Sequence, residues 1–89
     1  MTVESFQYFY AIAEGMTYME ASEEFNISQS SLSKAIFRLE DDLGIKLFDR
    51  SGHKVQLTQA GLQLYSDLKE VIPGYRRMLR NVEDRKSVV

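Results

Sequence analysis

The chain has 89 residues, which is enough for one domain with its own core. It contains no cysteine, which excludes disulfides and thiolate metal sites. It has neither an apolar run that could span a bilayer nor a signal-peptide pattern, so we expect a cytoplasmic protein with no membrane partner. The net charge of -2 argues weakly against nucleic acid as a partner.

The charges are unevenly distributed along the chain, and this weakens the argument from net charge. Residues 1–25 carry five acidic side chains and no basic ones, whereas residues 28–57 carry five basic side chains against four acidic ones. Residues 76–86 carry five basic side chains against two acidic ones. One side of the molecule can therefore be positive and face DNA, with modest non-specific affinity because each chain neutralises few phosphates.

A first helix is predicted between Thr2 and Gly15. Thr2 can serve as its N-cap and Gly15 as its stop. The apolar residues between them recur at helical spacing and form one stripe, which consists of Phe6, Phe9, Tyr10 and Ala13. We expect this stripe to face the core.

A capping box marks the start of a short second helix. The Thr17 hydroxyl can accept a hydrogen bond from the amide of Glu20, and the Glu20 carboxylate can accept one from the amide of Thr17. This helix is predicted to end near Phe25, because Asn26 tolerates the left-handed conformation that closes a helix.

Ser28 is the expected N-cap of a third helix, which Gly44 ends. Its inner stripe has the spacing 4, 3, 4 and consists of Leu32, Ile36, Leu39 and Leu43. The second helix, the turn at Asn26 and the third helix together predict a helix-turn-helix. Proteins use this arrangement to place a helix in the major groove of DNA.

The outer side of the third helix carries mainly small and polar side chains. At 100° per residue the outward positions are Ser30, Lys34, Phe37 and Asp41, with Ser33 and Arg38 at the flanks. The serines, Ser31 included, let the helix approach base edges, while Gln29 can bond adenine and Lys34 can reach guanine. Phe37 either meets a thymine methyl group or packs against the wing. The alternative for the whole face is the solvated side of an ordinary helix.

After Gly44 the apolar period changes from that of a helix to that of strands. Two short strands are predicted at Ile45–Arg50 and Lys54–Leu57, joined by a turn at residues 51–53. His53, the only histidine, has no neighbours suited to catalysis or to a metal ion, so we expect it to be solvated or to touch a DNA phosphate.

Thr58 can cap a last, long helix. A seam with the 3.5-residue period of helix–helix pairing runs along it through Leu64, Leu68, Val71, Tyr75, Met78 and Val82. We expect this seam to form a dimer interface, and the alternative is a single helix that covers only its own core. Pro73 removes a backbone donor and Gly74 follows it, so a kink or a break is expected there.

The predicted fold is mainly α. Residues 1–58 form a winged helix-turn-helix, with three helices and a short β-hairpin wing, and residues 59–89 form a linker and dimerisation helix with a tail. The recognition helix spans about Ser28–Leu43 and the wing about Lys46–Leu57. The sequence contains no catalytic constellation, glycine-rich phosphate loop or metal-ligand cluster, so we expect neither an enzyme nor a cofactor or metal ion.

Five motifs, in this order, resemble the N-terminal DNA-binding domain of LysR-type transcriptional regulators, from about Val3 to about Val82. They are FQYF (6–9), ASEEFNISQ (21–29), LSKAI (32–36), LEDDLGIKLFDR (39–50) and LTQAG (57–61). The resemblance implies a homodimer on an interrupted palindrome in a double-stranded DNA operator, with the last helices paired antiparallel. It places in the groove Gln29, Ser30, Ser31, Ser33 and Lys34. It places at the wing, beside the minor groove and the backbone, Arg50, His53 and Lys54.

The chain departs from the family pattern at several positions. The family usually has proline where Ser30 stands, arginine at Lys34 and a basic residue at Phe37, so the target sequence does not follow from the resemblance. Residues 21–22 are Ala-Ser where Ala-Ala is usual. Family members are considerably longer and have a C-terminal domain that senses a small molecule. A small-molecule effector is therefore implied only for a longer parent protein.

Two functions are compatible with these observations. The leading hypothesis is sequence-specific binding of double-stranded DNA by a homodimer in bacterial transcriptional regulation. The predicted contacts are Gln29, Ser30, Ser31, Ser33, Lys34, Phe37, Arg38, Arg50, His53 and Lys54. The alternative is a winged-helix module that binds protein through the last helix and binds DNA only incidentally, which the acidic balance and the wide apolar face of that helix support.

Overall fold

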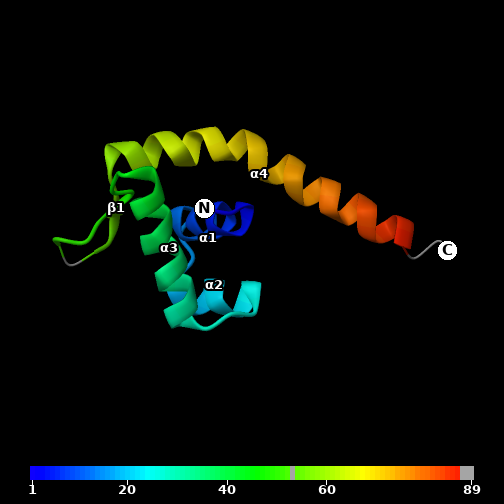
Figure 1. Ribbon diagram of the computed structural model, residues 1–89, viewed down its shortest axis with the longest axis horizontal. Helices are drawn as coiled ribbons and strands as arrows, with labels where there is room; N and C mark the ends of the chain where they lie inside the picture. The colour runs from blue at the N-terminus through cyan, green and yellow to red at the C-terminus, as the bar shows by residue number, and fades with distance from the viewer. Residues whose placement is uncertain (53, 87–89) are drawn as a thin grey trace.

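The computed structural model describes residues 1–52 and 54–86. The elements follow in the order α1 (Val3–Ala13), α2 (Tyr18–Phe25), α3 (Gln29–Leu43), β1 (Phe48–Asp49), β2 (Gln56–Leu57) and α4 (Gln59–Lys86). Figure 1 shows α1, α2 and α3 gathered on one side of α4, with the hairpin projecting beside the start of α4. The predicted winged helix-turn-helix followed by a long helix is confirmed.

The first three helices end in the same way, and these ends confirm the predicted stops. The chain leaves each of them through a residue with positive φ, namely Gly15, Asn26 and Gly44. After α2, for example, the amide of Ile27 donates to the carbonyl of Ser22 at 3.0 Å. This bond from the second residue beyond the helix is the mark of a Schellman motif. The chain therefore turns within residues 26–28, which separate α2 from α3.

The expected N-caps are also in place. The Thr17 hydroxyl oxygen accepts a hydrogen bond from the Glu20 amide at 3.0 Å, and Glu20 Oε1 accepts one from the Thr17 amide at 2.9 Å. Ser28 Oγ accepts a hydrogen bond from the amide of Ser31 at 3.1 Å, and the Thr2 side chain caps α1. Both helices of the helix-turn-helix thus begin where the sequence predicts.

The core lies between α1, α3, the start of the wing and the first half of α4. Its buried cluster consists of Phe9, Tyr10, Ile36, Leu39, Leu47, Phe48, Leu68 and Ile72. Three of the four residues of the predicted inner stripe of α3 are fully buried, but the prediction was wrong for Leu43, which is 38% exposed. The inward position in the last turn belongs instead to Glu40, because the wing packs over that side of α3 and donates hydrogen bonds to its carboxylate.

The strands of the wing are shorter than predicted. They form one antiparallel pair in which Phe48 lies opposite Leu57 and Asp49 opposite Gln56. Ile45 is not part of a strand, because its amide donates to the Glu40 carbonyl at 3.1 Å and so closes the end of α3. The predicted hairpin is correct in kind, and the predicted bounds of its strands were wrong.

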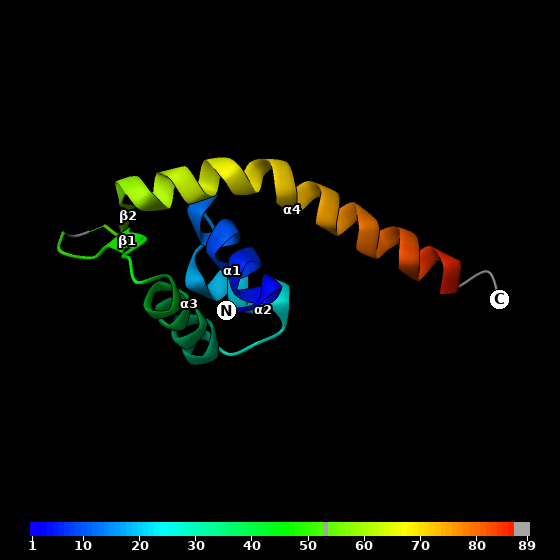
Figure 2. The ribbon, with the colours of Figure 1, turned by 45° about the horizontal axis from the view of Figure 1, so that its top comes forward.

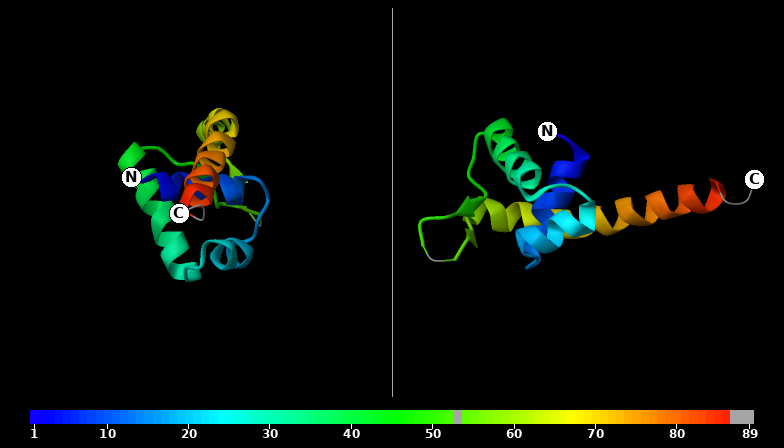
Figure 3. Two further views of the ribbon diagram at one scale, coloured as in Figure 1. Left: turned by 90° about the vertical axis from the view of Figure 1, so that its right-hand side faces the viewer. Right: turned by 90° about the horizontal axis from the view of Figure 1, so that it is seen from below.

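Helix α4 is continuous and has Pro73 in its interior. Figure 2 shows the helix bending in its yellow-to-orange part without interruption, so the expected kink is present and the expected break is not. Its first half lies along the domain, and Figure 3 shows its second half extending beyond it. The molecule is therefore elongated, with extents of 52, 26 and 22 Å. Within the described ranges, no helix has the length and apolar character needed to cross a membrane.

Candidate nucleic-acid interface

The first ten residues of α3 present the predicted polar face to solvent. The exposed side chains are those of Gln29, Ser30, Ser31, Lys34 and Arg38, while Ser33 is half-buried. The capping hydroxyl of Ser28 donates to Ser31 Oγ at 2.9 Å and lies 3.3 Å from Ser30 Oγ. The start of the helix is therefore narrow and rich in hydroxyl groups, so its backbone can approach another molecule closely.

Helix α2 supports α3 from behind and leaves that polar face free. Ala21 is fully buried, and Ser22 is 8% exposed. The Ser22 hydroxyl donates to the Met19 carbonyl at 2.7 Å, so this departure from Ala-Ala leaves no unpaired buried polar group. Tyr8 of α1 meets Phe25 of α2 edge to face, with ring centroids 4.9 Å apart.

Charge changes sign along the outer side of α3. Lys34 and Arg38 are the basic groups, and both are exposed. In the last turn Asp41 is exposed, and Asp42 accepts a hydrogen bond at 2.7 Å from the N-terminal ammonium of Met1. That hydrogen bond holds the pKa of Asp42 below its ordinary value. A polyanion approaching α3 would thus meet the positive charges in the second and third turns.

The wing presents a further basic residue to solvent. Lys54 is exposed and precedes β2. The turn before it is ordered by Asp49, whose Oδ1 accepts hydrogen bonds from the Ser51 hydroxyl at 2.6 Å and the Ser51 amide at 2.9 Å. These bonds, that of the hydroxyl above all, lower the pKa of Asp49. The predicted contact at His53 lies outside the described residues.

Arg50 is turned back from the tip of the wing towards α3. Its Nη1 donates to Glu40 Oε1 at 3.4 Å, and its guanidinium carbon lies 4.5 Å from the centre of the Phe37 ring. Phe37 contacts the wing through Arg50, which is one of its two predicted placements, and the residue remains 46% exposed. Sequence reasoning missed Glu40, whose position 80° from Leu32 on the helical wheel, beside the apolar stripe, was the available signal.

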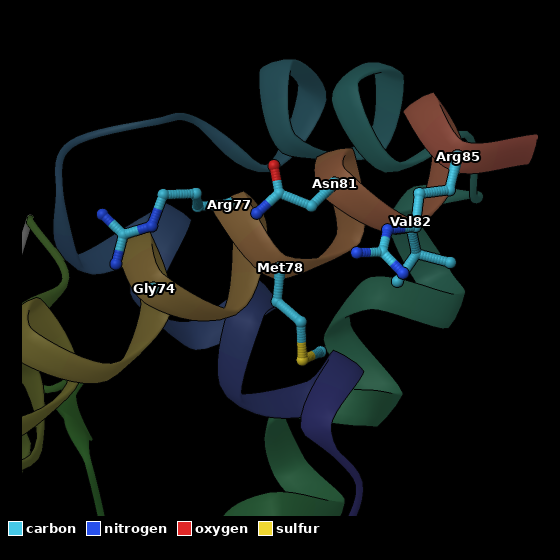
Figure 4. A pocket seen from close by; sticks show the side chains of 6 residues that line it. All are labelled: Gly74, Arg77, Met78, Asn81, Val82 and Arg85. Atoms are coloured by element: carbon cyan, nitrogen blue, oxygen red, sulfur yellow. The ribbon is translucent and has the colours of Figure 1, made fainter. Parts of the chain in front are cut away.

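The predicted seam of α4 divides between the core and the surface. Leu68 belongs to the core of its own chain, and Leu64 packs against that core while half-buried. Val71, Met78 and Val82 are 59%, 50% and 49% exposed, and Tyr75 is half-buried. Figure 4 shows a surface groove along the second half of the helix, which is lined by Gly74, Arg77, Met78, Asn81, Val82 and Arg85.

Comparison with known proteins gives this arrangement a context. Residues 3–62 match the model of a family described as bacterial regulatory helix-turn-helix proteins, lysR family. The chain is 32% identical over 88 residues to the RuBisCO operon transcriptional regulator of Allochromatium vinosum. The matched region covers 99% of this chain and 29% of that protein. It therefore spans less than a third of the length of that relative.

Solved structures share the fold of nearly the whole chain. Full-length AphB, a Vibrio cholerae virulence activator of the LTTR family, has a TM-score of 0.82 at 26% identity, over 92% of this chain and 28% of that chain. The BenM DNA-binding domain in complex with catB site 1 DNA has a TM-score of 0.79 at 27% identity, over 94% of each chain. The family match and these likenesses favour the DNA-binding hypothesis over a winged-helix module that binds protein and binds DNA only incidentally.

Proposed function

Because the chain belongs to the LysR family of bacterial regulatory helix-turn-helix proteins, we propose that it binds specific double-stranded DNA sites in the regulation of transcription. The observation that carries the proposal is the exposed polar face at the start of α3, which the helix-turn-helix leaves free. A helix so held and so narrow fits the major groove.

Within this proposal, the first turns of α3 read the bases. Gln29 offers an amide that can bond adenine twice, and the Lys34 ammonium can reach the acceptors of guanine. The small side chains that let the helix sit deep in the groove are those of Ser30, Ser31 and Ser33. Arg38 and the wing residue Lys54 are placed to neutralise phosphates, which fix the register of the protein without reading sequence.

We further propose that two copies pair through α4 and bind an interrupted palindrome as a homodimer. The support is the stripe of exposed apolar side chains from the middle of the helix towards its C-terminal end, at Val71, Met78 and Val82. Tyr75 lies on the same stripe and Leu64 continues it on the first half, so a second helix can cover both. Residues 59–86 thus serve as the linker and dimerisation helix, and the predicted tail at residues 87–89 lies outside the described residues.

Two finer points depend on this function. Bacterial DNA lies in the cytoplasm, so a protein that binds it to regulate genes is expected in the cytoplasm. Since the chain spans only 27–29% of two regulators it matches, any small-molecule effector would bind to a longer parent protein.

Selection of sites from a random pool of DNA duplexes, at near-physiological salt, tests the proposal directly. We expect a two-fold symmetric, interrupted consensus. On that site, Gln29→Ala and Lys34→Ala should each cost about 1–3 kcal/mol of binding free energy. Lys69→Ala is the matched control, because Lys69 lies over the Tyr65 ring on α4, away from α3. Recovery of only a salt-sensitive background, with no consensus, would contradict specific readout.

Dimerisation requires its own variants. Leu68 is unsuitable for this purpose, since it lies in the core and its replacement would act on folding. Val71→Asp should shift sedimentation to the monomer and weaken binding to the palindrome more than to a half-site. Leu62→Asp, at an exposed leucine on another side of α4, should leave the dimer intact. A dimer that survives Val71→Asp would exclude the α4 stripe as the interface.

A further inference from the structure

The connection between α3 and the wing depends on one buried carboxylate. Glu40 is 2% exposed, and its Oε2 accepts hydrogen bonds from the amides of Leu47 at 2.7 Å and Phe48 at 3.2 Å. Its Oε1 accepts the hydrogen bond from Arg50 at 3.4 Å. Among the described residues, the side-chain hydrogen bonds that join α3 to the wing all end on Glu40. The carboxylate fixes the beginning of β1, and Arg50 is the wing residue beyond β1 that reaches it.

Two aromatic rings hold the guanidinium of Arg50. Its central carbon lies 4.5 Å from the centre of the Phe37 ring on α3 and 5.4 Å from that of Phe48 on β1. Its Nη2 is buried and has no hydrogen-bond partner among the described residues. A guanidinium packed against rings in this way is attracted by the negative faces of the rings and is partly withdrawn from water.

We infer that Phe37 is a positioning residue, which holds Arg50 and therefore the wing at a set place relative to the recognition helix. Arg50 in turn acts on DNA binding through the wing and not as a phosphate ligand. Its charge is already compensated by Glu40, whose side chain is 1% exposed, whereas Lys54 is exposed. The inference rests on the proposed DNA-binding function, because it states how the second contact surface is placed relative to the first.

The shortness of the hairpin is the reason such a device matters. Each strand has two residues, and isolated two-stranded hairpins are marginal in water. Phe37 therefore adds a contact that the strands themselves do not supply. If the ring is removed, Lys54 loses its fixed distance from the groove-facing side of α3, and its contact with a phosphate becomes weaker.

A double-mutant cycle separates positioning from direct base contact. In the wild-type background, Lys54→Ala should reduce the slope of log K against log salt by about 1. In the Phe37→Leu background, Lys54→Ala should reduce this slope by less than half as much. In the Phe37→Tyr background, Lys54→Ala should again give the full reduction. If Phe37 instead touched a base, Phe37→Leu would change the preference at one position of the site, and the effect of Lys54→Ala would be unchanged. That result would overturn the inference.

Amide hydrogen exchange of the free protein gives an independent readout. In Phe37→Leu, exchange should accelerate at the Phe48 and Thr58 amides, which bind Glu40 and the Leu47 carbonyl. Exchange in α2 should be unchanged, which shows that the domain remains folded. A wild-type protein that binds no duplex would contradict the proposed function while leaving this readout to decide the inference. Unchanged exchange at the Phe48 and Thr58 amides would overturn the inference that Phe37 positions the wing.

Discussion

The helix-turn-helix and the wing are held in place by interactions of different sequence range. The turn between α2 and α3 is fixed by hydrogen bonds that reach at most five residues along the chain, such as that from Ile27 to Ser22. The wing is fixed by bonds that reach further, since Leu47 binds Glu40 seven residues away and the Thr58 hydroxyl binds the Lys46 carbonyl twelve residues away. The turn that joins α2 to α3 is therefore fixed locally, whereas the position of the wing depends on contacts with residues further along the chain.

The largest effect should follow from removing the carboxylate that anchors the wing. Glu40→Ala leaves the guanidinium of Arg50 and two backbone amides without their acceptor, so the free energy of unfolding should fall by about 3–5 kcal/mol. Urea denaturation measures this directly. Asp41→Ala, at the exposed neighbour, should change the same quantity by at most about 0.5 kcal/mol. Equal effects at the two positions would contradict the role given to Glu40.

Two glycines of α4 should respond to alanine in opposite directions. At Gly61 an added Cβ would overlap the backbone carbonyl of Leu47 at the entry to the wing, so Gly61→Ala should cost about 1–3 kcal/mol of stability. At Gly74 the nearest atom would be a guanidinium nitrogen of Arg77 at 3.9 Å, so Gly74→Ala should stabilise the helix by up to about 1 kcal/mol. Thermal unfolding of both variants checks the sign. A gain at Gly61 would mean that α4 does not lie so close to Leu47.

The same difference in range explains how much could be predicted from the sequence. The caps at Thr2, Thr17 and Ser28 and the stops at Gly15 and Gly44 are local patterns, and all are found in the structure. The placement of the polar face of α3 follows from them by helical geometry.

What the sequence could not supply depends on contacts between elements. The burial of Glu40 and the exposure of Leu43 are decided by which side of α3 the wing covers. On α4, periodicity alone could not separate Leu68, which enters the core, from Val71, which faces solvent.

A smaller loss is expected at the turn of the helix-turn-helix. Asn26 has φ 55° and ψ 48°, a conformation that alanine adopts at a cost, so Asn26→Ala should lower stability by about 1–2 kcal/mol. Asn26→Gly should lower it little or not at all, since glycine adopts positive φ freely. The pair is compared by urea denaturation. If both variants lost the same free energy, the side chain of Asn26 and not its backbone conformation would be responsible.

The smallest effect concerns the capping box of α2 and carries a signature in pH. Thr17→Ala should cost about 1 kcal/mol at neutral pH. Glu20 accepts the Thr17 amide, and this hydrogen bond lowers the pKa of the Glu20 carboxyl from its ordinary value of 4.5. A carboxyl whose pKa is lower in the folded state contributes stability above its unfolded pKa and loses it as pH falls through the folded value. The contribution of Glu20 should therefore decline below about pH 4.5, and Glu20→Gln should remove that decline while Asn26→Gly retains it. This titration would show that the cap of α2 acts locally. The junction between α3 and the wing depends instead on longer-range contacts, so the two regions would differ in solution as they do in the structure.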